Sequence, residues 1–170
     1  MDLIISSVGG GKYFATFHGN EYRCAIGKNG ISKNKREGDG TTPVGKFKII
    51  KLLYRKDRIT GLHSKIPTAQ IQPSAGWCDE PEDSLYNQQV KLPYKSSHEH
   101  LYRDDQIYDI IGVTNHNSNP IRSGAGSAIF IHLIRRAEYF PTKGCIAFKE
   151  KHLREIISLW EPDRDHLVIK

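Results

Sequence analysis

The chain has 170 residues, a formal net charge of +6 and a sequence pI near 9.2. Its 38% hydrophobic and 26% charged residues are typical of a globular protein long enough to bury a core, so we expect one domain over residues 1–170. No apolar stretch reaches the roughly eighteen residues of a membrane-spanning helix, and no aromatic and basic residues interleave as on a nucleic-acid surface. We therefore expect neither a membrane nor a nucleic-acid partner, although the basic charge favours an anionic ligand.

Residues 1–14 contain neither the basic start nor the long apolar run of a secretory signal. The sequence by itself therefore predicts a cytoplasmic protein. The segment that follows is typical of a β-hairpin. Aromatic and small residues fill 13–18, the pair Gly19-Asn20 interrupts them, and apolar residues then alternate with polar ones over 22–26.

Further strand signals follow, separated by two loops. The basic stretch 28–36 contains glycine and asparagine and is predicted to be a solvated loop. Residues 46–54 and 107–114 each predict a strand. Between them, 61–94 carries four prolines and is predicted to be a long excursion over the surface, of the kind that forms lids or binding loops.

The C-terminal part contains the one convincing helix signal. Apolar residues recur with the spacing of a helix face at Leu153, Ile156, Ile157 and Trp160. Pro162 ends this pattern, and 166–170 is predicted to be a closing strand. Strand signals between turns, with a single late helix, predict a mostly β fold. We expect a β-sandwich or barrel-like pair of sheets with one C-terminal amphipathic helix at its edge.

His132 interrupts an otherwise apolar run over 128–134, and this run predicts a strand buried on both faces. Two interpretations of a histidine in such a strand remain open. It is either a core residue that bonds a backbone carbonyl or a base that serves a nearby nucleophile.

The nucleophile could be Cys145, which ends the sequence Thr142-Lys143-Gly144-Cys145. Glycine before a cysteine lets a substrate approach the thiol and lets backbone N–H groups converge on one point, as in an oxyanion hole. A thiol attacks as its thiolate and needs a base, for which His132 is the candidate. The competing interpretation is an inert buried thiol beside a simple turn.

Four other residues have weaker signals. Lys143 either lowers the pKa of the neighbouring thiol or is merely solvated. His116, at the end of a predicted strand, either orients the base or contacts substrate, or is a turn residue. Cys24 alternates with apolar residues and is predicted to lie in the core. Cys78 lies in a predicted loop and is the rival nucleophile to Cys145.

Two other functional classes stay open on the residues alone. A zinc peptidase would draw its ligands from His63, Cys78, His98, His100, His116 and His132. The motif His98-Glu99-His100 is not the His-Glu-x-x-His of zinc peptidases, and residues so spaced on a strand rarely complete a tetrahedral site. The basic pI and scattered tyrosines would also fit a module that grips glycan or nucleic acid without chemistry.

Two motifs resemble one known family. His132 followed after a loop by residues 142–146, TKGCI, resembles the signature of the L,D-transpeptidase (YkuD-like) catalytic domain, which is a histidine and then Ser/Thr-x-Gly-Cys-aliphatic. Residues 38–47, GDGTTPVGKF, are similar to that family's Asp-Gly-x-Thr-Pro-x-Gly-x-Phe turn and strand. The likeness extends over most of the chain.

The resemblance implies a mostly β fold of mixed strands, no metal or other cofactor, and peptidoglycan stem peptides as partners. It assigns Cys145 as the nucleophile that attacks the carbonyl between the diamino acid and the fourth-position D-alanine. His132 is then the base, Gly144 and Thr142 shape the oxyanion site, and Lys143 and His116 are candidates for substrate contact.

Two positions depart from the family pattern. Lys143 stands where His or Arg is frequent, and Ala147 stands where Arg or Asn is common. The missing polar group at Ala147 predicts that water, as well as an amine, accepts the acyl group, which would give L,D-carboxypeptidase products. The resemblance also implies a bacterial protein of the periplasm or cell envelope, in contrast to the absent signal.

Overall fold

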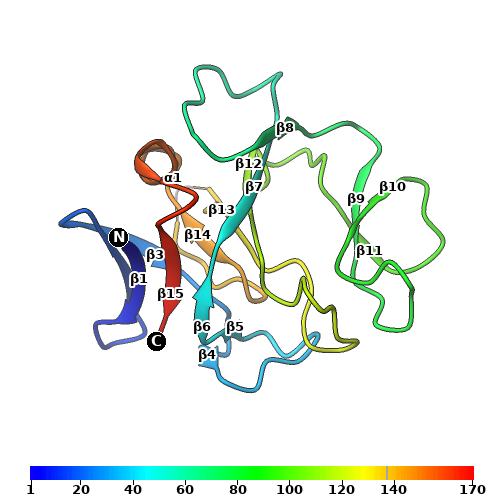
Figure 1. Cartoon of the computed structure of the whole chain (residues 1–170), viewed down its shortest axis with the longest axis horizontal. Helices are drawn as coiled ribbons and strands as arrows, with labels where there is room; N and C mark the ends of the chain where they lie inside the picture. The colour runs from blue at the N-terminus through cyan, green and yellow to red at the C-terminus, as the bar shows by residue number, and fades with distance from the viewer. Residues whose placement is uncertain (137) are drawn as a thin grey trace.

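The computed structural model describes residues 1–136 and 138–170 and is mostly β, with one helix among these residues (Figure 1). The strands are β1 (Asp2–Ser7), β2 (Tyr13–Phe17), β3 (Asn20–Ala25), β4 (Ile31–Ser32), β5 (Thr42–Pro43), β6 (Gly45–Phe47), β7 (Ile49–Tyr54), β8 (Thr68–Gln70), β9 (Ala75–Cys78), β10 (Gln89–Lys91), β11 (His98–His100), β12 (Ile110–Thr114), β13 (Phe130–Leu133), β14 (Ile146–Phe148) and β15 (His166–Ile169). The helix, α1 (Glu150–Leu159), comes late in the chain. The predicted mostly β class with a C-terminal helix is confirmed.

Ten strands form one curled sheet in the order β6-β15-β1-β2-β3-β14-β13-β12-β7-β8. The sheet is mixed, because β1–β15, β13–β14 and β7–β8 pair in parallel and the other neighbours are antiparallel. β6 lies at one edge and β7 near the other, yet only Lys48 separates them in the chain. The sheet therefore curls until its two ends meet, as Figure 1 shows, which gives the expected barrel-like form.

The N-terminal hairpin forms where it was predicted, with a shifted turn. Tyr13–Phe17 pairs with Asn20–Ala25, and Phe17 lies opposite Asn20. The loop is therefore His18-Gly19, whose φ angles of 47° and 77° suit the two-residue turns that match the strand twist. The expected Gly19-Asn20 turn was wrong by one residue.

The strand predicted over 46–54 is two strands, and its break has a local cause. At Lys48 the backbone N–H donates to Asn115 Oδ1 (2.8 Å), and the Lys48 carbonyl accepts the Asn115 N–H (3.0 Å). One residue thus satisfies both backbone groups where the chain passes from one end of the sheet to the other. The strands predicted over 107–114 and 128–134 are also shorter in the structure.

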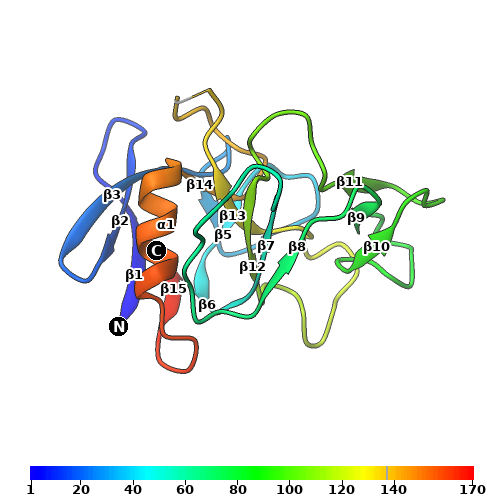
Figure 2. The same cartoon turned by 90° about the horizontal axis from the view of Figure 1, so that it is seen from above.

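The first core fills the space between the curled sheet and α1 (Figure 2). The predicted helix face is confirmed by four fully buried side chains: Leu153, Ile156, Ile157 and Trp160. They pack with inward residues of β13 and β14, namely Ile131, Leu133, Ile146 and Phe148. Burying each such side chain stabilises the fold by about 1.5–3 kcal/mol.

A second core lies on the opposite face of β7, β12 and β13, under a three-stranded sheet of order β10-β9-β11. The rings of Trp77 and Phe130 meet edge to face with centroids 5.0 Å apart. Asn87 Oδ1 accepts both the Trp77 indole N–H (3.0 Å) and the Ala128 N–H (3.0 Å), which ties the small sheet to the large one. The segment 61–94, predicted to be an irregular excursion, thus contributes the strands β8, β9 and β10.

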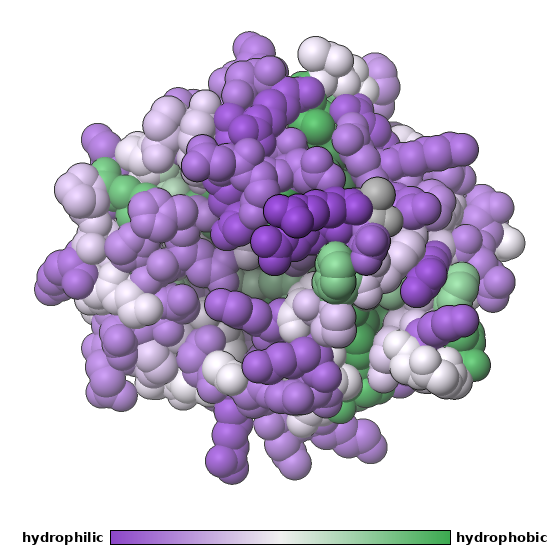
Figure 3. Space-filling view, turned by 180° about the vertical axis from the view of Figure 1, so that it is seen from behind, coloured by the Kyte–Doolittle hydropathy of each residue, from purple (hydrophilic) through white to green (hydrophobic). Residues whose placement is uncertain are grey.

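Among the described residues, no helix is long and apolar enough to cross a membrane. The face in Figure 3 is mostly hydrophilic, with apolar residues gathered in small patches.

Candidate active site

The segment that carries Cys145 is held by the buried side chain of Thr42, from the GDGTTPVG motif. Thr42 Oγ1 donates to the Gly144 carbonyl (2.8 Å) and accepts the Gly27 N–H (2.8 Å). Thr142 joins the same support, because its N–H donates to the Ile26 carbonyl (2.8 Å). The two motifs noted in the sequence therefore meet in space, and one supports the other.

Gly144 fits a position where a side chain would clash. Its φ is +146°, and a Cβ there would lie 2.8 Å from the Thr41 carbonyl oxygen. The Gly144 N–H donates to Thr142 Oγ1 (3.1 Å), and that hydroxyl donates to the Cys145 carbonyl (2.7 Å). Thr142 thus closes a tight turn directly before the thiol, and the Gly144 N–H is already paired within it.

Cys145 is buried at the head of β14, with 9% of its surface exposed. Its thiol donates to the Ala128 carbonyl (3.1 Å) and accepts the Phe130 N–H (3.4 Å). Ala128 has a φ of 50°, an unusual value for alanine, and its strain aims the carbonyl at the sulfur. Burial raises the pKa of the Cys145 thiol to about 12, so the resting group is protonated at neutral pH.

His132 lies on β13 and is also buried. Its Nδ1 lies 2.8 Å from the carbonyl oxygen of Leu133. A carbonyl only accepts, so Nδ1 carries the hydrogen and Nε2 keeps its lone pair. Burial lowers the pKa of His132 to about 4, which keeps the imidazole neutral at pH 7 with a free lone pair on Nε2. The two sequence interpretations are therefore compatible, because the carbonyl bond fixes the tautomer that a base needs.

Strand register places these two side chains on one face of the sheet. β13 and β14 are parallel, with His132 opposite Ala147. Side chains alternate along a strand, so Cys145, two residues before Ala147, lies on the His132 face and one diagonal step away. In the described part of the chain no hydrogen bond joins the two side chains. Catalytic hydrogen bonds are often long without substrate and shorten in the complex.

The two predicted substrate contacts, Lys143 and His116, differ in their exposure. Lys143 is exposed, and its positive charge offsets part of the rise in pKa that burial causes at Glu99. His116 is partly buried, its Nε2 lies 3.0 Å from the Ala125 carbonyl oxygen, and burial lowers its pKa. Among the described residues neither is hydrogen-bonded to Cys145, so their substrate roles stay predictions.

The cation that acts on the thiol is Lys35, which the sequence placed in a solvated loop. That prediction was wrong for Lys35, since only 6% of its side chain is exposed. Its Nζ bonds Asp39 (2.5 Å) and lies 3.7 Å from where a Cβ on Gly144 would stand. Burial and the negative charge of Glu99 both raise the pKa of Cys145, whereas the positive charge of Lys35 lowers it.

Tyr108 and Glu99 complete the surroundings, and the sequence did not single them out. The Tyr108 hydroxyl donates to Glu99 Oε2 (2.5 Å), and the Tyr108 ring meets the His132 ring at 5.4 Å between centroids. Tyr108 also packs in the same buried cluster as Cys145. In the sequence, Glu99 was noted only as part of His98-Glu99-His100, a motif considered for metal binding.

The other thiols differ from Cys145 in their surroundings. Cys78 is fully buried on β9, so its expected loop location was wrong. Cys24 is buried in the first core as predicted, and burial raises its pKa to about 12. Within residues 1–136 and 138–170, no three His, Cys, Asp or Glu side chains gather to hold a metal ion. The zinc-peptidase alternative therefore has no ligand set in this part of the chain.

The family model of the L,D-transpeptidase catalytic domain (YkuD) matches residues 8–169. The chain belongs to this family. No curated protein sequence gives a significant match. The match of the L,D-transpeptidase domain covers both motifs, α1 and every named strand except β1, so the unit that the family defines is nearly the whole chain.

Proposed function

We propose that this L,D-transpeptidase domain transfers acyl groups of peptidoglycan stem peptides through a thioester on Cys145. The observation that carries the proposal is the shared face of β13 and β14. It holds a thiol and a neutral imidazole whose Nε2 is the unprotonated nitrogen. A protonated thiol with a pKa of about 12 needs such a base.

The reaction follows from these two groups. His132 Nε2 takes the Cys145 proton, and the sulfur attacks the carbonyl carbon between the diamino acid and the fourth-position D-alanine. The tetrahedral intermediate collapses as His132 returns the proton to the leaving amine, which departs as D-alanine. The thioester is then attacked by an acceptor amine or by water, and the thiol is restored.

The oxyanion of this intermediate needs a hydrogen-bond donor. The Gly144 N–H is paired with Thr142 Oγ1, so in our proposal the Cys145 N–H is the donor and Gly144 and Thr142 shape the turn that presents it. Removing one such donor typically costs about 10²–10³ in rate. The exact loop shape, held by Thr42, therefore matters nearly as much as the thiol.

Water should compete with the acceptor amine. The side chain of Ala147 is buried with Ala25 and Ile134 and offers no polar group beside the thioester. An amine must be bound and desolvated to outcompete water, which requires placed polar contacts. We infer L,D-carboxypeptidase activity, tetrapeptide to tripeptide plus D-alanine, beside cross-linking or D-amino-acid exchange.

Mass spectrometry of products from tetrapeptide muropeptides, with and without excess D-amino acid, tests this function. We expect tripeptide in both reactions and exchanged tetrapeptide when the D-amino acid is added. Exchange and dimers without tripeptide at any acceptor concentration would contradict the hydrolytic branch. No turnover of any stem peptide would contradict the function.

The proposed substrate implies that the protein works in a bacterial cell envelope, and this location is part of the proposal.

A further inference from the structure

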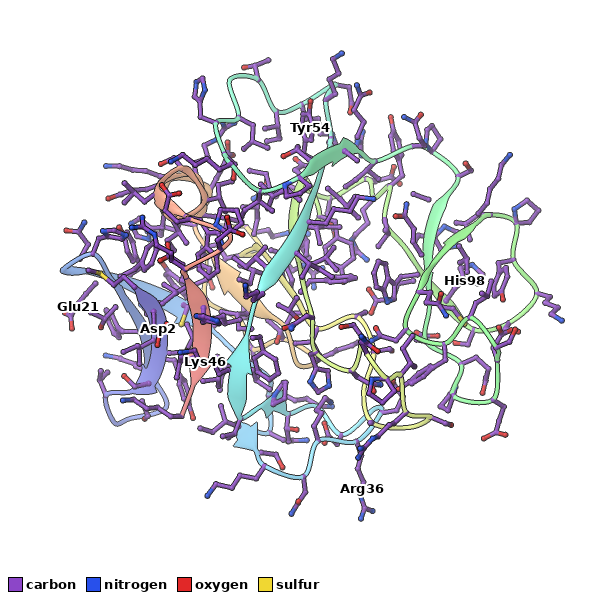
Figure 4. All side chains as sticks on the ribbon, in the orientation of Figure 1. Asp2, Glu21, Arg36, Lys46, Tyr54 and His98 are labelled. Carbon is purple, nitrogen blue, oxygen red and sulfur yellow. The ribbon has the colours of Figure 1, made fainter. Side chains whose placement is uncertain are left out.

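The small sheet directs one acidic side chain towards the nucleophile. β9 and β11 pair antiparallel, with Glu99 opposite Trp77, so the two side chains share a face. Trp77 packs on Phe130, whose N–H donates to the Cys145 sulfur. Glu99 therefore faces the second core and the thiol. In Figure 4, the label of its neighbour His98 marks this strand.

Glu99 has a hydrogen bond but no ion-pair partner among the described residues. Its Oε2 accepts the Tyr108 hydroxyl, and burial raises its pKa. Arg103, whose charge also acts on Glu99, bonds Asp105 through two hydrogen bonds of 2.8 and 2.6 Å. Lys143 is exposed and affects Glu99 only through its charge. A partly buried carboxylate commonly pairs with a cation, and this one has no ion-pair partner among the described residues.

The carboxylate also opposes the chemistry that we propose. A negative charge beside a thiol disfavours the thiolate, and Glu99 is the second cause, after burial, of the raised Cys145 pKa. A bound cation would neutralise this charge and remove the obstacle. Among the described residues no cationic side chain bonds Glu99, which leaves this carboxylate free for the cation of a ligand.

We propose that Glu99 is a specificity residue that binds an ammonium group of the acyl donor next to Cys145. Cationic donors are then selected, and their binding helps to activate the thiol. Applied to stem peptides, the cation is the side-chain amine of the diamino acid whose carbonyl is attacked. This last assignment rests on the proposed function, whereas the cation selectivity of Cys145 does not.

Charged methanethiosulfonates test the selectivity without any peptide. In this reaction the Cys145 thiolate attacks the sulfenyl sulfur, forms a mixed disulfide and releases methanesulfinate. We expect wild type to react with the 2-aminoethyl reagent at least about tenfold faster than with the 2-sulfonatoethyl reagent, after correction for a free thiol. Glu99→Gln should abolish this ratio, and its reaction with the neutral methyl reagent should become faster. Peptide mapping assigns the label to Cys145.

Two variants serve as controls. Glu155→Gln removes a carboxylate that also accepts a tyrosine hydroxyl, that of Tyr22 at 2.9 Å, but it lies on α1. It should leave the ratio unchanged. Glu99→Asp keeps the negative charge and should keep part of the preference for the 2-aminoethyl reagent. This variant still tests the proposal if Glu99→Gln is unstable. An unchanged ratio in a folded Glu99→Gln, or equal rates for both reagents in wild type, would overturn the proposal.

A tetrapeptide with its diamino-acid side chain either free or acetylated tests the donor assignment. Wild type should show a KM at least about tenfold lower for the free amine, and Glu99→Gln should treat the two peptides alike. If neither peptide is turned over while the reagent ratio holds, the proposed function fails and the cation site stands. If both are turned over equally by wild type, the assignment of the cation to the diamino acid fails.

Discussion

The two faces of the ten-stranded sheet use the same strands but have different covers. On one face, α1 contributes Leu153 and Ile156, and the cluster is apolar. On the other, the small sheet and its loops bring Tyr108 and Glu99 over the strand that holds His132. Successive residues of β13 and β14 therefore face either the first core, under α1, or the second core, on the side that carries Cys145 and His132.

The two faces also each bury a cysteine. Burial raises the pKa of Cys24 and of Cys145 to about 12, so acidity alone does not identify the nucleophile. Their neighbours differ instead. Cys145 has His132 on its own face, a glycine turn before it and Lys35 nearby. Cys24 has the apolar first core around it.

The largest contrast is expected between Cys145→Ala and Cys24→Ala. Cys145→Ala should lower turnover of stem peptides by at least about a thousandfold, because the thioester cannot form. Its melting temperature should stay within about 5 °C of wild type. Cys24→Ala should keep the turnover. Kinetics and thermal melts of both variants measure this, and activity that survives in Cys145→Ala would move the nucleophile elsewhere.

His132→Gln should lower kcat/KM by about 10²–10⁴, the contribution of a positioned base. The fold should persist, since glutamine can still reach a backbone carbonyl. The readouts are kcat/KM and the rate of Cys145 alkylation in the same preparation. If the variant unfolds while Cys145 in the remaining folded protein alkylates at the wild-type rate, His132 is a core residue and not the base.

On the helix-covered face, Ile156→Ala should cost about 2–5 kcal/mol in the free energy of unfolding, because it leaves a cavity at a fully buried position. The kcat/KM of the folded protein should not change. Leu159→Ala, at the exposed end of α1, is the matched control with little expected cost. Urea unfolding beside kinetics separates the two effects, and a loss of kcat/KM in folded Ile156→Ala would show that the faces are coupled.

The smallest effect is a pH dependence on the reactive face. The pKa of His132 is about 4 in the folded protein, below its usual 6.5, so the unfolded chain binds the proton first. Stability from this residue is full above pH 6.5 and is lost as the pH falls towards 4. His132→Gln should gain on wild type by on the order of 2 kcal/mol between pH 7 and 4.5. If the difference in unfolding free energy between wild type and His132→Gln is the same at both pH values, the buried neutral imidazole is contradicted.

Much of the reactive face could be predicted from sequence because its motifs are local. Thr142 to Cys145 form one turn. On the opposite face, the spacing of apolar residues alone predicted the buried side of α1. The predicted hairpin turn was wrong by one residue because His18, like Gly19, adopts a positive φ. A histidine in the sequence does not indicate this conformation.

Lys35 and Glu99 could not be predicted, because their burial comes from distant segments. Lys35 lies among other basic residues in the sequence, and it is enclosed by the distant segments that contain Gly126 and Gly144. Glu99 lies in a short polar strand, and its position is set by the pairing of this strand with β9 and by the hydrogen bond from the Tyr108 hydroxyl. Such contacts leave no periodic trace in either segment.

The most direct test of the account is intact-mass analysis of the protein mixed with a defined tetrapeptide and quenched in acid. The account predicts a covalent adduct with the mass of the donor minus D-alanine, mapped to Cys145 and absent in Cys145→Ala. Turnover of the tetrapeptide without any adduct on Cys145, or an adduct on Cys78 or Cys24, would contradict it.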